Sequence, residues 1–248
     1  QMEQTRRTIM LYARSPAAVL IEGETGTGKE LAAQAIHREY FSRRGAPARG
    51  ATPPFVAINC GAIAESLLEA ELFGYEEGAF TGSRRGGRRG LLETANGGTL
   101  FLDEIGEMSP RMQTKLLRFL NDGTFRRVGE DHEVHVDVRV ICATQKNLIE
   151  LVQKGLFRED LYYRLNVLTL YLPPLRDCPQ DIMPLTELFV ARFADEQGVA
   201  RPKLASDLGG FLSKYGWPGN VRQLVNVIEQ CVALTSSPVI GDALVEQA

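Results

Sequence analysis

Long apolar runs, paired cysteines and an excess of positive charge are all missing from this sequence of 248 residues. No apolar stretch approaches the roughly 18 residues that a membrane-spanning helix needs. Residues 1–14 are polar and amphipathic and lack the apolar core of a signal peptide. The four cysteines form no C-x-x-C pair, which indicates reduced thiols in a cytoplasmic protein. The lack of a long apolar run predicts no membrane association. They are Cys60, Cys142, Cys178 and Cys231.

Charge and histidine are equally modest. The chain carries 28 Lys and Arg against 31 Asp and Glu, a net charge of −3, so it is not a polycation that coats nucleic acid. His132 and His135 are close enough in sequence to share a metal, but no cysteine or carboxylate cluster accompanies them, which favours surface polar groups. The composition, 44% hydrophobic and 24% charged, predicts one large globular domain or a medium domain with a small satellite.

Short apolar runs alternate with segments of helical periodicity over most of the chain. The runs predict buried strands at 17–22, 55–58, 98–102, 138–143 and 167–172. The periodic segments predict helices at 2–14, 30–40, 64–73, 110–121, 148–154 and 158–163, and residues 124–136 predict a hairpin. This alternation indicates an α/β fold, a parallel sheet with helices on both faces.

The pattern changes at a Pro-rich boundary near residues 173–178. Three helices are predicted after it, at 181–196, 204–214 and 220–235, with no strand between them and only a short turn near 238–240. We therefore divide the chain into an α/β nucleotide-binding subdomain, 1–175, and a small all-α lid subdomain, 176–248. Of two Gly- and Arg-rich segments, 43–54 is predicted to be an exposed loop and 74–90 an irregular, mobile excursion.

A glycine-rich loop follows the first predicted strand and opens a helix, the context that a phosphate-binding loop requires. Glycines let backbone N–H groups turn towards phosphates, and the lysine reaches the β- and γ-phosphates. The alternative is an ordinary glycine turn, which the strand, loop and helix in succession disfavour. One departure is a glutamate where most such loops carry Ser or Thr to hold Mg²⁺. The candidate residues are Gly23, Glu24, Thr25, Gly26, Thr27, Gly28, Lys29 and Glu30.

A second motif is the apolar strand 99–102 followed by Asp103 and Glu104. This is the Walker B arrangement, in which Asp103 orients Mg²⁺ through water and Glu104 polarises the attacking water. Two acids at a strand end could instead cap the next helix, but that interpretation weakens beside the phosphate-binding loop. Together the motifs predict hydrolysis of Mg·ATP.

With these motifs the sequence resembles the AAA+ ATPases, and among them the bacterial activators of sigma-54 RNA polymerase. The most specific match is five of the six residues of the family's GAFTGA signature, in a loop that the resemblance identifies as the sigma-54 contact. Glycines allow hinge motion and an exposed aromatic suits an interface anchor; in the alternative interpretation, the phenylalanine packs into the core. The six residues are Gly78, Ala79, Phe80, Thr81, Gly82 and Ser83.

The resemblance assigns further roles one residue at a time. Asn59, after the second strand, resembles the switch residue that holds Glu104 away from water, although a turn asparagine would look the same. Thr144, at the end of the fourth strand, resembles sensor I. Arg222 resembles sensor II, which points at the γ-phosphate one turn into a helix that Asn220 is expected to cap.

Arg158 and Arg164 resemble two arginine fingers, which reach the transferred phosphoryl group of a neighbouring subunit. For Arg158, pairing with Glu159 or Asp160 within the chain is a serious alternative. Residues 123–131 resemble the family's second pore loop. The arginine pairs at 84–85 and 88–89 could meet DNA phosphates, but a solvated loop base is favoured.

The family therefore implies a homo-oligomer, expected to be a hexamer, which uses ATP and Mg²⁺ to remodel the sigma-54 RNA polymerase closed complex. DNA binding is expected from a helix-turn-helix domain absent from this chain, which we interpret as a central motor domain. Residues 37–41, residues 43–54 and the loop that ends in Ser83 resemble the propionate-catabolism subgroup. Two other functions remain open: an ATP-dependent assembly switch that scarcely hydrolyses, and an AAA+ unfoldase.

Overall fold

The computed structural model describes residues 2–44, 52–79, 86–234 and 239–247. Its contacts divide the chain into two compact units, each treated by itself below. The larger unit comprises Arg6–Glu22 and Lys29–Tyr171, and the smaller comprises Gln1–Thr5, Gly23–Gly28 and Leu172–Ala248. The proposed division at 175/176 stays a proposal, because the glycine loop groups with the C-terminal segment.

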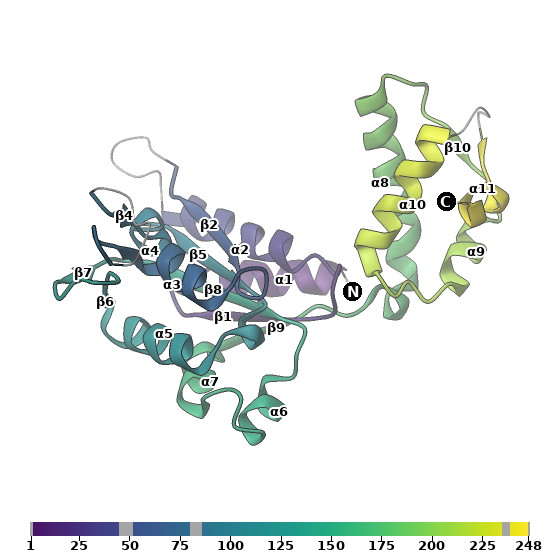
Figure 1. Cartoon of the computed structure of the whole chain (residues 1–248). Coiled ribbons are helices and arrows are strands. Elements are labelled where there is room, and N and C mark those ends of the chain that lie inside the picture. The colour runs from purple at the N-terminus through teal and green to yellow at the C-terminus, as the bar shows by residue number, and fades with distance from the viewer. Residues whose placement is uncertain (1, 45–51, 80–85, 235–238, 248) are drawn as a thin grey trace. The chain divides into compact units, whose positions relative to one another are not determined.

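A parallel sheet of five strands, in the order β2-β5-β8-β1-β9, forms the centre of the larger unit (Figure 1). The strand order is not the chain order, so the connections cross over through helices, as parallel pairing demands. All five predicted strands are confirmed within two residues at each end. They are β1 Val19–Glu22, β2 Phe55–Asn59, β5 Thr99–Asp103, β8 Arg139–Thr144 and β9 Leu168–Tyr171.

Helices flank this sheet, and α5 illustrates how the sequence sets their ends. Ser109 accepts a hydrogen bond from the Met112 N–H at 3.4 Å, Pro110 occupies the first turn, and Gly123 ends the helix at φ 68°. The helices are α1 Met2–Tyr12, α2 Lys29–Arg44, α3 Glu65–Phe73, α4 Leu91–Thr94, α5 Pro110–Asp122, α6 Leu148–Gln153 and α7 Glu159–Leu165, with a 3₁₀ turn η1 at Ile105–Glu107.

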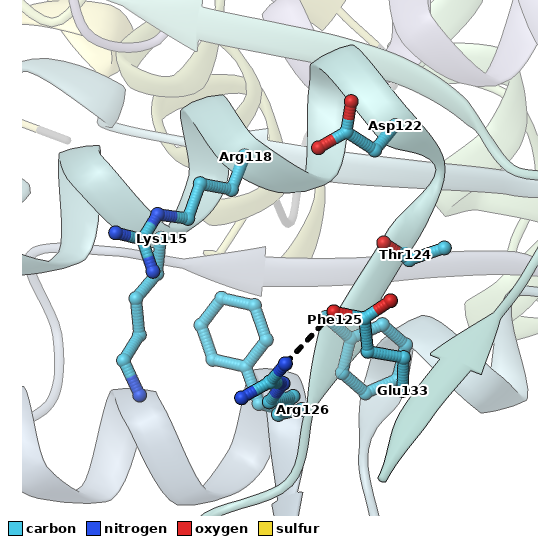
Figure 2. Close-up of a pocket in the computed structure, with 8 residues that line it drawn as sticks. Lys115, Arg118, Asp122, Thr124, Phe125, Arg126 and Glu133 are labelled. Carbon is cyan, nitrogen blue, oxygen red and sulfur yellow. Dashed lines mark hydrogen bonds and ion pairs between the residues drawn. The ribbon is translucent and has the colours of Figure 1, made fainter. Parts of the chain in front are cut away.

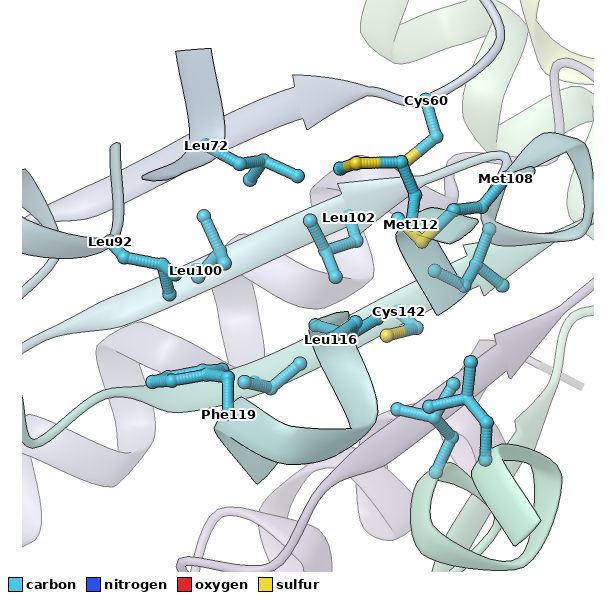
Figure 3. Packing of buried hydrophobic residues seen from close by; sticks show 14 of the residues in the cluster. Cys60, Leu72, Leu92, Leu100, Leu102, Met108, Met112, Leu116, Phe119 and Cys142 are labelled. Carbon is cyan, nitrogen blue, oxygen red and sulfur yellow. The ribbon is translucent and has the colours of Figure 1, made fainter. Parts of the chain in front are cut away.

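The main core lies between the sheet and the helices that follow β2 and β5 (Figure 3). Leu100 and Leu102 project from β5 towards Met112, Leu116 and Phe119 of α5, and all five are buried. Burying one such side chain stabilises the fold by about 1.5–3 kcal/mol. This packing holds α5 against the strand that ends in Asp103, so residues on α5 keep a defined position relative to Asp103 and Glu104.

Two small sheets stand beside the central one. The predicted hairpin is confirmed as β6 Thr124–Arg126 paired with β7 Glu133–His135. Residues 74–90, predicted as an irregular excursion, instead begin and end in a short antiparallel pair, β3 Gly74–Tyr75 with β4 Arg88–Arg89. Two residues per strand are too few to show a period of two, so the sequence pattern could not reveal this stem.

The smaller unit is a helical lid with its own core around Trp217, Leu224 and Ile228. The predicted helix at 204–214 is wrong in its first turn, because Leu204 lies in a short parallel strand pair and the helix starts at Leu208. Within the described residues, no helix is long and apolar enough to cross a membrane. The elements are η2 Leu175–Asp177, α8 Pro179–Gln197, β10 Lys203–Leu204, α9 Leu208–Lys214, α10 Asn220–Leu234, β11 Val239–Ile240 and α11 Asp242–Gln247.

Candidate functional site

The carboxyl edge of the parallel sheet gathers four of the predicted site residues. Asn59 is the register partner of Asp103 at the ends of β2 and β5, and Thr144 ends β8, the strand on the other side of β5. Glu104 follows Asp103 directly. Because all the strands are parallel, their last residues meet at one edge, where open α/β sheets bind ligands.

The acidic pair has strained local geometry. Glu104 is in the left-handed region at φ 53°, which non-glycine residues adopt rarely and mostly at functional sites. Asp103 Oδ1 accepts the Glu104 N–H at 2.9 Å, and the Asp103 carbonyl accepts the Cys60 N–H at 2.9 Å. Glu104 Oε2 is buried and has no hydrogen-bond partner among the described residues. An unpaired buried carboxylate oxygen is costly and calls for a ligand or water.

Electrostatics favour proton acceptance at Glu104. Burial raises the pKa of this carboxyl above its usual value, the neighbouring Asp103 raises it further, and Lys29 partly offsets both. A carboxylate whose pKa is raised is a better base towards water than an ordinary surface glutamate. The pair therefore combines an oriented acceptor, Asp103, with a more basic one.

Asn59 and Thr144 flank the pair with different partners. Asn59 is exposed, and its Oδ1 accepts the Gly61 N–H at 2.9 Å; among the described residues it makes this bond and none to Glu104. Thr144 is buried, and its Oγ1 accepts the Lys146 N–H at 3.0 Å. The Asn59 amide and the Thr144 hydroxyl thus both stabilise turns at the sheet edge, which is the structural alternative for each. The switch role of Asn59 and the sensor role of Thr144 stay predictions.

The glycine loop has the backbone that its composition predicts. Gly26 and Gly28 have φ values of 81° and 94°, and a Cβ on Gly26 would lie 2.2 Å from the Gly219 carbonyl oxygen, so no other residue fits there. Thr27 Oγ1 donates to the Glu24 carbonyl at 2.8 Å. Lys29 is buried at the start of α2, whereas Glu30 is exposed. The strand, loop and helix succession is thus confirmed.

The smaller unit ties this loop to the start of α10. Arg176 donates to both carboxylate oxygens of Glu24, at 2.6 and 2.8 Å, and lowers the pKa of that carboxyl to about 2. Asn220 Nδ2 donates to the Thr25 carbonyl at 2.9 Å, and the Arg222 N–H donates to the Gly26 carbonyl at 3.2 Å. The Arg222 side chain is exposed.

The expected capping by Asn220 is wrong in its detail. Its Oδ1 accepts the Leu175 N–H at 2.8 Å instead of a donor in its own helix, and its φ is 53°. The side chain of Gln223 takes over the helix start by accepting the Gly219 N–H at 3.0 Å. Both Glu24 and Arg176 were outside the sensor II motif, so sequence reasoning missed this connection.

The two candidate arginine fingers are exposed and engaged within the chain. Arg158 donates to both carboxylate oxygens of Asp160, at 3.0 and 2.7 Å, which is the alternative that the sequence left open. Arg164 donates to the Leu120 carbonyl of α5 at 3.2 and 2.8 Å. A surface pair of this kind is weak, so a phosphoryl group could replace either partner. The finger roles stay predictions.

The predicted sigma-54 contact lies mostly outside the described residues, namely Phe80, Thr81, Gly82 and Ser83, together with Arg84 and Arg85. Gly78 has φ 81°, and the Ala79 N–H donates to the Glu76 carbonyl at 3.2 Å. A Cβ on Gly129, in the hairpin turn, would lie 3.0 Å from the Ala79 Cβ. The start of the loop therefore lies against the β6–β7 turn.

Arg127, between β6 and β7, joins this hairpin to the two segments that flank the loop. We call these segments its stems: residues 74–77 before the loop and residues 88–94 after it. It donates to the two carboxylate oxygens of Glu93, both at 2.9 Å, and to Glu76 at 2.6 Å. Backbone bonds add to the connection, since the Glu76 N–H donates to the Val128 carbonyl at 3.0 Å. Sequence reasoning placed Arg127 in a pore-loop-like segment but missed its partners, because Glu76 and Glu93 are far away in sequence.

A cavity of about 270 Å³ lies between α5 and the β6–β7 hairpin, and its lining does not include the acidic pair (Figure 2). The buried rings of Phe73 and Phe125 form its apolar part, and charged side chains surround it. Nothing in its lining resembles the predicted nucleotide site. The lining residues are Phe73, Lys115, Arg118, Asp122, Thr124, Phe125, Arg126 and Glu133.

The side chains at the sheet edge fit a magnesium ion that is held mainly by phosphate and water. Among the described residues, no three His, Cys, Asp or Glu side chains converge on a common point. Asp103, with one oxygen held by the Glu104 N–H and one remaining, fits an ion that phosphate and water mainly hold.

Family models match nearly the whole chain. The Sigma-54 interaction domain matches residues 1–171, and the AAA+ ATPase lid domain matches residues 176–248. The chain belongs to the sigma-54 interaction domain family. Its fold is the AAA+ fold, a parallel α/β sheet domain with a helical lid.

Curated relatives of this sigma-54 interaction domain are transcription regulators. The regulatory protein TyrR of Salmonella typhimurium strain LT2 is 67% identical over 227 residues, which cover 92% of this chain and 40% of TyrR. The regulatory protein GlrR of Escherichia coli strain K12 is 50% identical over 247 residues, which cover 100% of this chain and 53% of GlrR. The chain thus spans about half or less of the length of these relatives. The propionate subgroup stays a prediction.

Solved structures agree with this assignment. NtrX from Brucella abortus in complex with ADP superposes with a TM-score of 0.87 at 38% identity, over 98% of this chain and 52% of that one. NtrX has also been solved in complex with ATP, with a TM-score of 0.85. Hsp104 with a TM-score of 0.58 at 19% identity shows a shared fold alone.

Proposed function

We propose that this chain is an ATPase that binds Mg·ATP at the carboxyl edge of its sheet and hydrolyses it. The observation that carries this proposal is Glu104: a buried, unpartnered carboxylate oxygen in a strained backbone conformation, with a raised pKa, directly after Asp103. A purely structural acid would be hydrogen-bonded or exposed. Structures of the relative NtrX with ADP and with ATP support a nucleotide as the ligand.

Each neighbouring residue has a distinct task in this proposal. Lys29 binds the β- and γ-phosphates, and the N–H groups of Gly23–Gly28 surround them. Asp103 holds the water shell of Mg²⁺, which when bound neutralises charge on the phosphates. Glu104 accepts a proton from the attacking water. Glu30 is exposed and takes no part in holding the ion.

The site is completed by a neighbouring subunit. Arg158 lies just before α7 and Arg164 lies on it. Both guanidinium groups are exposed, and among the described residues they are bound by the Asp160 carboxylate and the Leu120 carbonyl. In a homo-oligomer, which we propose to be a hexamer, they stabilise charge on the phosphoryl group bound by the next subunit. Arg222, Thr144 and Asn59 sense the γ-phosphate within one subunit.

The output is remodelling of the sigma-54 RNA polymerase closed complex by the loop of residues 78–83. Support comes from the family assignment and from the Arg127 connection, which ties both stems of that loop to the β6–β7 hairpin. A loop fixed at both stems can transmit a movement of the hairpin to its tip.

Two substitutions separate hydrolysis from its output. Glu104→Gln should bind ATP with unchanged affinity and lose at least about a hundredfold in turnover, because the amide cannot accept the proton. Phe80→Ala should keep ATPase activity and lose sigma-54-dependent transcription, measured with the polymerase holoenzyme on a supercoiled template. Substantial turnover in Glu104→Gln would reject Glu104 as the base. Loss of both activities in Phe80→Ala would reject the tip role, and binding without turnover in the native chain would favour the assembly switch.

A further inference from the structure

Gln113 is a fully buried polar side chain that lies outside every motif described above. It projects from the first turns of α5, between the 3₁₀ turn behind the acidic pair and the segment that leads into α7. Its amide is almost fully hydrogen-bonded. Nε2 donates to the Met108 carbonyl at 2.7 Å and to the Leu156 carbonyl at 3.0 Å, and Oε1 accepts the Arg158 N–H at 2.8 Å.

These partners fix the amide in one orientation. The flipped amide would place its oxygen against two carbonyls and its NH₂ against an N–H, which is repulsive on all three sides. No other neutral side chain of similar length offers two donors and an acceptor in one plane. Gln113 is therefore chosen for its hydrogen bonds and not only for its volume.

The three partners belong to two segments with different proposed tasks. Met108 follows η1, whose turn is closed by the Glu107 N–H donating to the Glu104 carbonyl at 2.9 Å. Leu156 and Arg158 flank the buried Phe157 at the entry to α7. One side chain thus links the backbone just beyond the subunit's own Glu104 to the backbone of its candidate finger.

The second candidate finger is anchored on the same helix, since Arg164 donates to the Leu120 carbonyl near the end of α5. Helix α5 is in turn packed against β5 through Leu116 and Met112. Through α5, both arginines are therefore connected to the strand that ends in Asp103. The rigid connection from one subunit's acidic pair to its arginines passes through α5.

We propose that Gln113 is a positioning residue for the Arg158 finger, which holds residues 156–158 so that the subunit presents Arg158 to the nucleotide of its neighbour. The proposal rests on the shared-site ATPase proposed above. Gln113 is fully buried, so the role proposed for it involves no contact with nucleotide or with the attacking water. Its loss should therefore impair the site of the next subunit and spare the site of its own.

Mixed assemblies of this chain separate the two effects. A Lys29→Ala subunit loses its own phosphate contact but keeps its arginines, and so acts as a finger donor. An Arg158→Ala subunit keeps its nucleotide residues but offers no finger, and so acts as a site owner. Each should be nearly inactive alone, and a mixture should recover ATPase activity wherever an owner meets a donor.

Gln113→Met, which keeps the volume and removes the hydrogen bonds, is then added to one subunit type at a time. In the donor it should lower the recovered rate by about tenfold or more, the effect of about 1.4 kcal/mol on a transition state. In the site owner it should change the rate by less than about twofold. The second arm is the matched control, because folding losses would affect both arms, and thermal melting of both doubly substituted subunits checks this directly.

A second variant adds a readout that a volume effect would not move. In Gln113→Glu, burial raises the pKa of the introduced carboxyl. The protonated acid can still accept from Arg158 and donate to one carbonyl, whereas the carboxylate can donate to neither. With this variant in the donor, the recovered rate, divided by that of the unsubstituted mixture at each pH, should fall as pH rises.

The outcomes are distinct. Equal losses in both arms, or no loss in the donor arm together with a flat pH ratio, would overturn the positioning role while leaving the ATPase proposal intact. Absence of any recovery in the parent mixture would overturn the shared site itself, and the positioning role with it. Selective loss in the donor arm with a falling pH ratio supports the role of Gln113.

Discussion

At the scale of single residues, Glu104 shows how a candidate site can be recognised by features that are unfavourable for folding. Its carboxylate is partly buried beside Asp103, one oxygen lacks a partner among the described residues, and its backbone is left-handed. A buried carboxylate oxygen without a partner and a left-handed non-glycine backbone each carry a cost in folding free energy. Proteins retain such strain where activity requires it.

The raised pKa of Glu104 gives a stability prediction with a definite sign. The folded state binds this proton more tightly than the unfolded state, so folding stability falls as pH rises from the ordinary carboxyl pKa through the raised one. Glu104→Gln should therefore raise the unfolding free energy by about 1 kcal/mol at about pH 8, and by almost nothing at about pH 4. Thermal or urea unfolding at the two pH values measures this.

Glu107→Gln is the matched control for that measurement. Glu107 lies in the same turn, but it is exposed and paired with Lys146 at 2.8 Å. Its substitution should not stabilise the chain at either pH. A Glu104→Gln variant that is no more stable than the native chain at about pH 8 would show that the carboxylate is not under strain.

At the scale of elements, the β6–β7 hairpin and the loop stems act together through Arg127. This guanidinium is 22% exposed, and the Glu93 side chain that it binds is 13% exposed, so solvent screens the pair only partly. Glu76 leads into the loop and Glu93 follows its return. Removing Arg127 would take this cation from Glu76 and would leave Glu93 with only the longer pair to Arg89, at 3.9 Å, among the described residues, so both stems would be released from the hairpin.

Arg127→Ala should therefore lower the unfolding free energy by about 1–2 kcal/mol. It should also reduce transcription activation at least about tenfold while ATPase activity stays within about twofold, because the nucleotide residues are untouched. The adjacent Arg126→Ala is the control: its pair with Glu133 is 57% exposed on both sides and should contribute at most about 0.5 kcal/mol. Equal effects of the two substitutions would contradict the special role of Arg127.

The elements that the sequence could predict are those with a long pattern. Buried parallel strands such as β5 are continuous apolar runs, and α5 combines periodicity with Ser109, Pro110 and Gly123 at its ends. The β3–β4 and β10–β11 pairs are too short to carry a period. These short pairs form because the surrounding fold brings the two segments of each pair together.

The candidate site divides in the same way. Motifs at a strand end or in a glycine loop predicted Asp103, Glu104 and Lys29, because their chemistry is local in sequence. The roles of Gln113 and Arg127 could not be predicted, because they depend on hydrogen-bond partners tens of residues away in the sequence. Glutamine at one buried helix position has no sequence signal that distinguishes it from a surface glutamine.

At the scale of the whole molecule, the central claim is that hydrolysis needs two copies of this chain. The proposed phosphate-binding and acidic residues belong to the same chain as Arg158 and Arg164, but these two arginines bind Asp160 and the Leu120 carbonyl on and beside α7 and are proposed to act on the neighbouring subunit. The specific ATPase rate should then rise with protein concentration as subunits associate. A site complete within one subunit would give a constant specific rate.

The most direct measurement is the specific ATPase rate across a wide range of protein concentration, for the native chain and for Arg164→Ala. We predict a specific rate that rises with concentration in the native chain, and a specific rate for the variant that stays about a hundredfold or more below the native one wherever the native subunits are associated. A rate that is independent of concentration and unchanged in Arg164→Ala would contradict the shared site.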